Sequence, residues 1–163
     1  MSSPIRFACM RTYLLTLLVL PFFSNAQKER YLSFELAGSG GLASINYEKE
    51  LLQKEKARLY YRLGFSFAPV DRNNGAAFVF PLMLHTKIGQ GKHLLDLGLG
   101  QTISITSRGN FFFKIPASLG YRIEPPDKKQ FWRFSYTPII SYLFNYQWEH
   151  WGGITFGYKI GAS

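Results

Sequence analysis

The sequence of 163 residues lacks several features that would define other classes of protein. Its single cysteine, Cys9, lies close to the N-terminus, so no disulfide framework can hold the rest of the chain together. No apolar run reaches the roughly 20 residues that a membrane-spanning helix needs. Acidic residues number 10 against 19 Lys and Arg, but the basic residues are scattered and form no run, so we expect no nucleic-acid partner.

Metal-binding patterns are also missing. The three histidines are His85, His93 and His150, and no two of them have the spacing of metal ligands. We therefore expect no metal site and no cofactor.

The first residues predict an export signal. Arg6 and Arg11 precede the apolar run 13–23, and the small-residue end Ser24-Asn25-Ala26 follows it. A basic region, a short apolar region and a small-residue cleavage site are typical of a secretory signal peptide. We predict a signal peptide over residues 1–26 and one domain over residues 27–163. A start at Met10 instead of Met1 would leave a signal peptide of the same kind.

Beyond Ala26, apolar residues recur at every second position, which indicates strands rather than helices. Turn signals such as GSGG at 38–41 and DRNNG at 71–75 separate the alternating segments. Only EKELLQKEK, at 48–56, could form a helical turn. The predicted strands are Tyr31–Gly38, Leu42–Lys49, Ala57–Ala68, Ala77–Ile88, Lys92–Thr106, Phe111–Ile123, Phe131–Tyr142 and His150–Ile160.

Eight segments of this length predict an all-β fold, a closed antiparallel up-and-down transmembrane barrel. Ten residues at about 3.3 Å each, tilted by about 45°, rise roughly 23 Å, close to the height of the apolar band of such barrels. A water-soluble barrel or sandwich has strands of similar length, so the direction in which the apolar side chains point must decide between them.

The two faces of the predicted strands differ sharply. The interior of an eight-stranded barrel is only just wide enough to be filled by side chains, so the bulkier apolar set should face outward. The residues expected to face lipid are Leu63, Leu82, Leu84, Leu95, Leu97, Leu99, Ile154, Phe156 and Tyr158. The polar residues expected to face the lumen are Glu35, Glu48, Arg58, Arg62, His85, Lys87, Asp96, Lys114, Arg122, Arg133 and Lys159.

Aromatic residues gather near the predicted strand ends, as the two interfaces of a bilayer select. One predicted rim holds Tyr31, Tyr121, Phe131, Trp132 and Tyr158. The other holds Phe65, Phe67, Phe78, Phe80, Phe111, Tyr142, Phe144, Tyr146, Trp148 and Trp151.

Three stretches, SNAQ at the signal end, GSGGLASINYEK and GGITFGYKI, carry a resemblance that extends from Tyr31 to Ile160. The chain resembles the small outer-membrane β-barrel proteins of Gram-negative bacteria, many of which have no assigned function. The resemblance implies delivery by periplasmic chaperones and insertion by the barrel-assembly machinery. In such families the last strand is an assembly signal that usually ends on an aromatic residue, a place that Ile160 takes here.

Charged groups confined in a lumen should pair, because an unpaired buried ion is costly. We predict that His85 pairs with Asp96 and that Glu48 pairs with Arg58 across the Lys49–Lys56 turn. Inner basic residues outnumber acidic ones in this assignment, so some would face water or an anion. Pro81, Pro116 and Pro138 lie within strands, where we expect bulges or the ends of the membrane-embedded part.

These patterns predict a monomeric, non-enzymatic protein of the outer membrane, with a structural or surface-interaction role and with lipid and lipopolysaccharide as partners. Arg72 and Arg108 are candidate contacts to lipopolysaccharide phosphates. One alternative is a lipid-modifying enzyme of the lipid A deacylase or acyltransferase kind, for which His150 with Ser104 or Ser107 is the only suitable set. The other is a secreted lipocalin-like carrier, in which the two faces would be reversed.

Overall fold

The alternating segments form eight strands in the computed structural model, which describes residues 28–71, 75–141 and 147–162. The predicted signal peptide and Arg72 lie outside these residues. The strands are β1 (Glu29–Leu36), β2 (Ala43–Gln53), β3 (Ala57–Asp71), β4 (Gly75–Ile88), β5 (His93–Thr106), β6 (Phe111–Ile123), β7 (Gln130–Ser141) and β8 (Gln147–Ala162).

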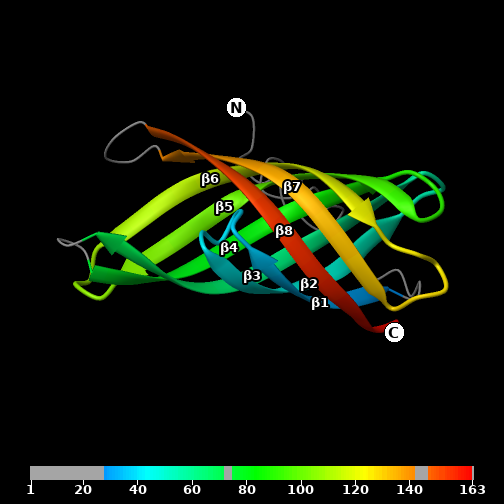
Figure 1. The fold of residues 1–163 in the computed structure, drawn as a ribbon, viewed down its shortest axis with the longest axis horizontal. Helices are drawn as coiled ribbons and strands as arrows, with labels where there is room; N and C mark the ends of the chain where they lie inside the picture. The colour runs from blue at the N-terminus through cyan, green and yellow to red at the C-terminus, as the bar shows by residue number, and fades with distance from the viewer. Residues whose placement is uncertain (1–27, 72–74, 142–146, 163) are drawn as a thin grey trace, which may run out of the picture.

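The strands pair antiparallel in chain order, and β8 closes the barrel by pairing with β1 (Figure 1). The prediction of an all-β, eight-stranded, closed antiparallel barrel is therefore confirmed. Closure pairs the two strands that would otherwise present free edges. Within the described part of the chain, no helix is both long enough and apolar enough to cross a membrane.

Strand bounds depart from the prediction mainly at the ends. The EKELLQKEK stretch forms no helical turn; β2 continues through Gln53, with a register shift between Glu50 and Leu52. β8 begins at Gln147 rather than His150, so part of the predicted connection 143–149 is strand. Residues 142–146 of that connection lie outside the described residues.

The two ends of the barrel carry different connections. We call the end where β1 begins and β8 ends the terminal end; it holds the connections 54–56, 89–92 and 124–129. The opposite, distal end holds the described connections 37–42 and 107–110.

Side chains alternate between the two faces of the wall along each strand, as the pleat of a strand requires. The nine apolar residues predicted to face outward lie on the outer surface, each 37% to 62% exposed. They are Leu63, Leu82, Leu84, Leu95, Leu97, Leu99, Ile154, Phe156 and Tyr158. The buried side chains of the interior are mostly polar or charged.

Three prolines lie within strands, and each coincides with an interruption of one ladder. Pro81 lies where the β3–β4 ladder passes from the Leu63–Leu82 pair to the Ser66–Val79 pair. Pro116 and Pro138 lie in similar interruptions of the β5–β6 and β6–β7 ladders. The register is the same on both sides of each interruption, so the predicted bulges are wrong: the missing N–H removes rungs without adding a residue.

Candidate functional site in the barrel interior

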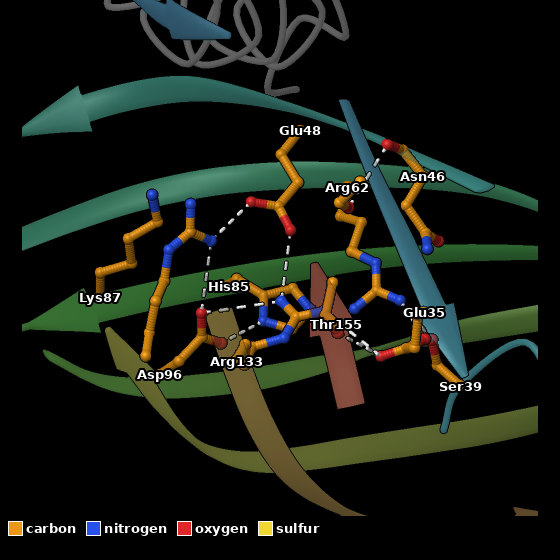
Figure 2. Close-up of polar contacts among 12 residues, drawn as sticks. Glu35, Ser39, Asn46, Glu48, Arg62, His85, Lys87, Asp96, Arg133 and Thr155 are labelled. Carbon is orange, nitrogen blue, oxygen red and sulfur yellow. Dashed lines mark hydrogen bonds and ion pairs between the residues drawn. The ribbon is translucent and has the colours of Figure 1, made fainter. Parts of the chain in front are cut away.

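The barrel interior is the candidate site, because alternation turns charged residues from all eight strands toward a common axis. The polar side chains of this interior lie close together and contact one another across the lumen (Figure 2). Of the predicted inner set, Glu35, Glu48, Arg62, His85, Lys87, Asp96, Arg122 and Arg133 are buried. Arg58, Lys114 and Lys159 are about one third exposed near the two ends.

His85 and Asp96 form the pair that was predicted for them. Nδ1 of His85 lies 2.6 Å from Oδ1 of Asp96, and both side chains are buried. His85 is the direct partner of Gly98 across the β4–β5 ladder, and a Cβ atom on Gly98 would stand 2.5 Å from the imidazole Cε1. The imidazole of His85 can therefore pack against the backbone of Gly98 only because this residue has no side chain.

Glu48 lies at the centre of the network and accepts hydrogen bonds from two arginines of other strands. Nη1 of Arg122 donates to its Oε2 at 2.8 Å, and Nη1 of Arg133 donates to its Oε1 at 3.2 Å. The same two Nη1 atoms lie 3.9 and 3.7 Å from Oδ2 of Asp96. Two guanidinium groups thus share two carboxylates, so each of the four buried charges has opposite charges beside it.

The predicted pairing of Glu48 with Arg58 is wrong. β2 extends into the expected turn as far as Gln53, so Glu48 stands opposite Arg62, while Arg58 stands opposite Gln53 nearer the terminal end. Nη1 of Arg58 instead donates to Oε2 of Glu29 at 3.3 Å, and Lys159 also pairs with Glu29. The continuation of β2 to Gln53, which the sequence pattern did not reveal, separates the two predicted partners.

Toward the distal end, the β1–β2 connection folds into the mouth of the barrel. Ser39 is buried, and its hydroxyl donates to Oε2 of Glu35 at 3.3 Å and accepts from Nη2 of Arg62 at 3.1 Å. Arg62 also pairs directly with Glu35. The sequence suggested only a turn here, but the positive φ angles of Gly38 (103°) and Gly41 (85°) bend the connection inward.

Toward the terminal end, the interior is lined by aromatic rings. Tyr31, Tyr60 and Phe131 form a buried cluster, in which the centroid of the Tyr31 ring lies 6.0 Å from that of Tyr60 and 5.5 Å from that of Phe131. The Nζ atom of Lys87 lies 3.6 Å from the centroid of the Tyr60 ring, and Cζ of Arg122 lies 3.3 Å from that of Phe131. Tyr31 and Phe131 were predicted to belong to an outer rim; both point inward instead, because their positions in β1 and β7 share the inner face.

Glu124 closes the terminal end of the network. It follows the last residue of β6, accepts a hydrogen bond from Nε of Arg122 at 2.6 Å and pairs with Lys87 at 3.2 Å. Tyr31 also donates a hydrogen bond to it. Burial raises the pKa of this carboxyl, but the charges of Arg122 and Lys87 outweigh burial and hold the pKa below its ordinary value.

The expected excess of inner basic residues is also wrong. Four carboxylates that the predicted inner set did not contain, Glu29, Glu50, Glu124 and Glu149, lie toward the lumen near the strand ends. Among the side chains that the structure describes, these four together with Glu35, Glu48 and Asp96 equal in number the seven inner Lys and Arg residues Arg58, Arg62, Lys87, Lys114, Arg122, Arg133 and Lys159. Each of these basic residues has a carboxylate partner within 4.0 Å.

The three histidines lie in different surroundings. Nε2 of His85 has no hydrogen-bond partner in the described part of the chain. His150 points outward from β8, with Nδ1 lying 2.5 Å from the Tyr136 hydroxyl, whereas Ser104 is buried on the inner face of β5. His93 is exposed and hydrogen-bonds to the hydroxyl of Tyr121. No group of three His, Cys, Asp or Glu residues among those described could hold a metal ion.

Comparison with known proteins gives no relative of this chain. No family model, no curated protein and no solved structure matches it.

Proposed function

We propose that the protein is an integral outer-membrane β-barrel with a polar lumen filled by side chains, exported by its N-terminal signal peptide. Its role in this proposal is structural or one of surface interaction, without a catalytic step. The observation that carries the proposal is the inverted distribution of side chains: the outer wall is apolar and the interior is charged.

The energetics of this inversion support lipid as the surroundings. A barrel in water gains most of its stability by burying apolar side chains inside. Here Leu, Ile and Phe side chains from every strand remain exposed on the outer wall, far beyond the isolated patches that water-soluble monomers show. Closure of the barrel leaves no free strand edge, as a hydrocarbon environment requires. A lipocalin-like carrier would need the opposite arrangement of the two faces.

The filled interior supports a structural role rather than catalysis or passage of solutes. The inner arginines and carboxylates neutralise one another, and the buried side chains Arg62, Arg122, Arg133 and Lys87 extend from different strands into the shared space. The closed ladder offers no free edge for strand addition, in keeping with a monomer. The partners in this proposal are membrane lipid, lipopolysaccharide, periplasmic chaperones and the barrel-assembly machinery.

A cell-fractionation experiment tests the proposal. The full chain, signal peptide included, is produced in a Gram-negative host, and the membranes are separated by density. We expect the mature chain to sediment with outer membranes, to resist extraction by urea, and to migrate differently in gels before and after boiling. Recovery in the soluble periplasmic fraction without detergent, with unchanged mobility on boiling, would overturn the proposal.

A contact with lipopolysaccharide at the distal end is part of the same proposal. Arg108 is exposed on the β5–β6 connection, and Arg72 lies in the connection after β3, outside the described residues. Arginine binds phosphate oxygens in a bidentate manner, so these residues would meet lipid A phosphates. The double Arg72→Ala, Arg108→Ala variant should co-purify with less lipopolysaccharide than the parent; unchanged association would refute the contact.

A further inference from the structure

The outer wall at the terminal end carries a small polar cluster on β1, β2 and β3, formed by Arg30, Lys49, Tyr47 and Tyr61. Arg30 and Lys49 are direct partners in the β1–β2 ladder, and Lys49 is the direct partner of Tyr61 in the β2–β3 ladder. All four side chains point outward and are half-buried. Two cations directly opposite each other on one face of a sheet repel and destabilise that pair of strands.

No carboxylate of the described residues neutralises these two cations. None of the ion pairs among those residues includes Arg30 or Lys49. Their chain neighbours Glu29, Glu48 and Glu50 occupy the alternate positions, point into the lumen and are bound there. Nε of Arg30 is buried and has no hydrogen-bond partner. Alternation has thus placed the acids inside and left two unneutralised cations outside.

The surroundings of the cluster are suited to a ligand with an anionic and an apolar part. The rings of Tyr47 and Tyr61 lie with their centroids 6.2 Å apart, and Tyr47 extends the cluster along β2 toward the middle of the barrel. Beyond them the wall is apolar: Leu32 and Leu63 are the direct partners of Tyr47 in β1 and β3, and both are exposed. On the other side of Arg30, its partner Gly161 in β8 leaves open space.

We propose that this cluster binds the phosphate of a phospholipid headgroup, with the acyl chains lying along the apolar wall beside Leu32 and Leu63. The guanidinium of Arg30 offers a fork that matches two phosphate oxygens, and the ammonium of Lys49 supplies a second charge. Tyrosine hydroxyls are suited to the boundary between headgroups and acyl chains. The inference rests on the proposed membrane location and adds a specific lipid site to it.

The rest of the terminal end favours an anionic lipid over a zwitterionic one. Its connections expose Lys54, Lys56, Lys92, Lys128 and Lys129 against only Glu55 and Asp127. A basic rim of this kind attracts an anionic lipid surface without binding one lipid in a fixed place. The paired geometry of Arg30 and Lys49 is what distinguishes a site from this general attraction, and Lys128 and Lys129 therefore provide the matched control.

The test measures retention of phosphatidylglycerol by the refolded protein in detergent, using mass spectrometry of the intact complex. The parent should retain the lipid, and the Arg30→Gln, Lys49→Gln double variant should bind it on the order of tenfold more weakly, given the contribution of each cation near an anionic lipid. The control double variant Lys128→Gln, Lys129→Gln removes the same charge across the barrel and should bind nearly as tightly as the parent.

Three outcomes would overturn the site: no retention by the parent, equal losses in the two double variants, or displacement of the lipid by inorganic phosphate at modest excess. Equal losses would indicate general attraction by the basic end, and displacement would indicate a site for free phosphate. Refolding of every variant into lipid vesicles is measured in parallel. If the parent refolds into vesicles but shows no specific lipid retention, only the lipid site is refuted. If the parent refolds into no vesicles, the result counts against the membrane proposal itself.

Discussion

Gly157 in β8 lies directly against the ring of Phe131 in β7: a Cβ atom on Gly157 would stand 2.1 Å from Cε1 of that ring. Phe131 in turn packs against Tyr31 and beneath the guanidinium of Arg122. Gly157 thus leaves space inside the barrel for the Phe131 ring of the neighbouring strand. The aromatic cluster depends on this space.

Substitution of this glycine should destabilise the barrel. Gly157→Ala would force Phe131 out of its position, at a cost of about 1–3 kcal/mol, as for overpacking in other interiors. Gly152→Ala on the same strand is the control, because nothing lies within 4 Å of its added Cβ. Urea unfolding of both variants in lipid vesicles measures the difference. Equal unfolding midpoints would show that the ring moves aside without cost.

Removal of the Glu48 carboxylate should be costly. It accepts hydrogen bonds from both Arg122 and Arg133, so Glu48→Gln would leave two buried guanidinium groups with too little negative charge. Breaking a buried ion pair by removing one partner costs about 3–5 kcal/mol. Glu55→Gln, on the exposed β2–β3 connection, changes the same charge without such contacts. The loss of unfolding free energy relative to the parent should be several-fold larger for Glu48→Gln than for Glu55→Gln. Similar losses would contradict a structural role of the contacts of Glu48.

Acid should weaken the terminal end through Glu124. Its pKa in the folded barrel lies below the ordinary value of 4.5, so it binds a proton less readily when folded than when unfolded. Its contribution to stability is therefore complete above pH 4.5 and is lost as the pH falls through the lower folded value. Glu124→Gln should flatten this part of the pH profile of the unfolding midpoint. A profile identical to that of the parent below pH 4.5 would show that other carboxylates alone cause the acid sensitivity.

The filled lumen should not conduct ions. Arg62, Glu35 and Ser39 occupy the distal mouth, and the aromatic cluster with Lys87 occupies the terminal half. We expect the purified protein in planar bilayers to show no stable steps of the size that open porins give. Such steps, recorded repeatedly from refolded protein, would mean that the inner side chains leave an aqueous path.

The sequence was sufficient to predict the strands and the barrel because alternation and turn signals are local. Phe111–Ile123 was predicted with the bounds that the structure has, and the His85–Asp96 pair followed from one tight connection. Partners set by strand register over a longer connection could not be predicted. β2 continues to Gln53, so the connection to β3 is shorter than predicted and Arg58 lies away from Glu48. The contacts of Glu48 with Arg122 and Arg133 arise only when the closed barrel brings β2, β6 and β7 around one lumen.

Inner aromatic residues were missed for a related reason. Tyr31 and Phe131 were assigned to an aromatic rim because they lie near the ends of predicted strands, and Tyr60 was assigned to neither face. Whether a large ring fits inside depends on the residues opposite it in adjacent strands, such as Gly157 opposite Phe131. That pairing of a large with a small residue is visible only once the register is known.

The outward direction of Leu97 is the point on which the membrane proposal depends most directly. Its side chain lies on the outer wall between Leu95 and Leu99 of β5 and beside Leu119 of β6, whereas the adjacent Asp96 is fully buried in the lumen. A lysine on the lipid face costs about 2–4 kcal/mol near the bilayer midplane and about 0–1 kcal/mol near an interface. Leu97→Lys should therefore fold poorly into vesicles.

Ile123→Lys is the control for depth, because Ile123 ends β6 at the terminal end, where a lysine can extend to the headgroups. We expect refolding yields into lipid vesicles to fall in the order parent, Ile123→Lys, Leu97→Lys, with the last clearly lowest. A water-soluble barrel has no reason to show this dependence on depth, since both residues lie on the same outer surface. Equal refolding of Leu97→Lys and the parent would remove the basis for assigning this face to lipid.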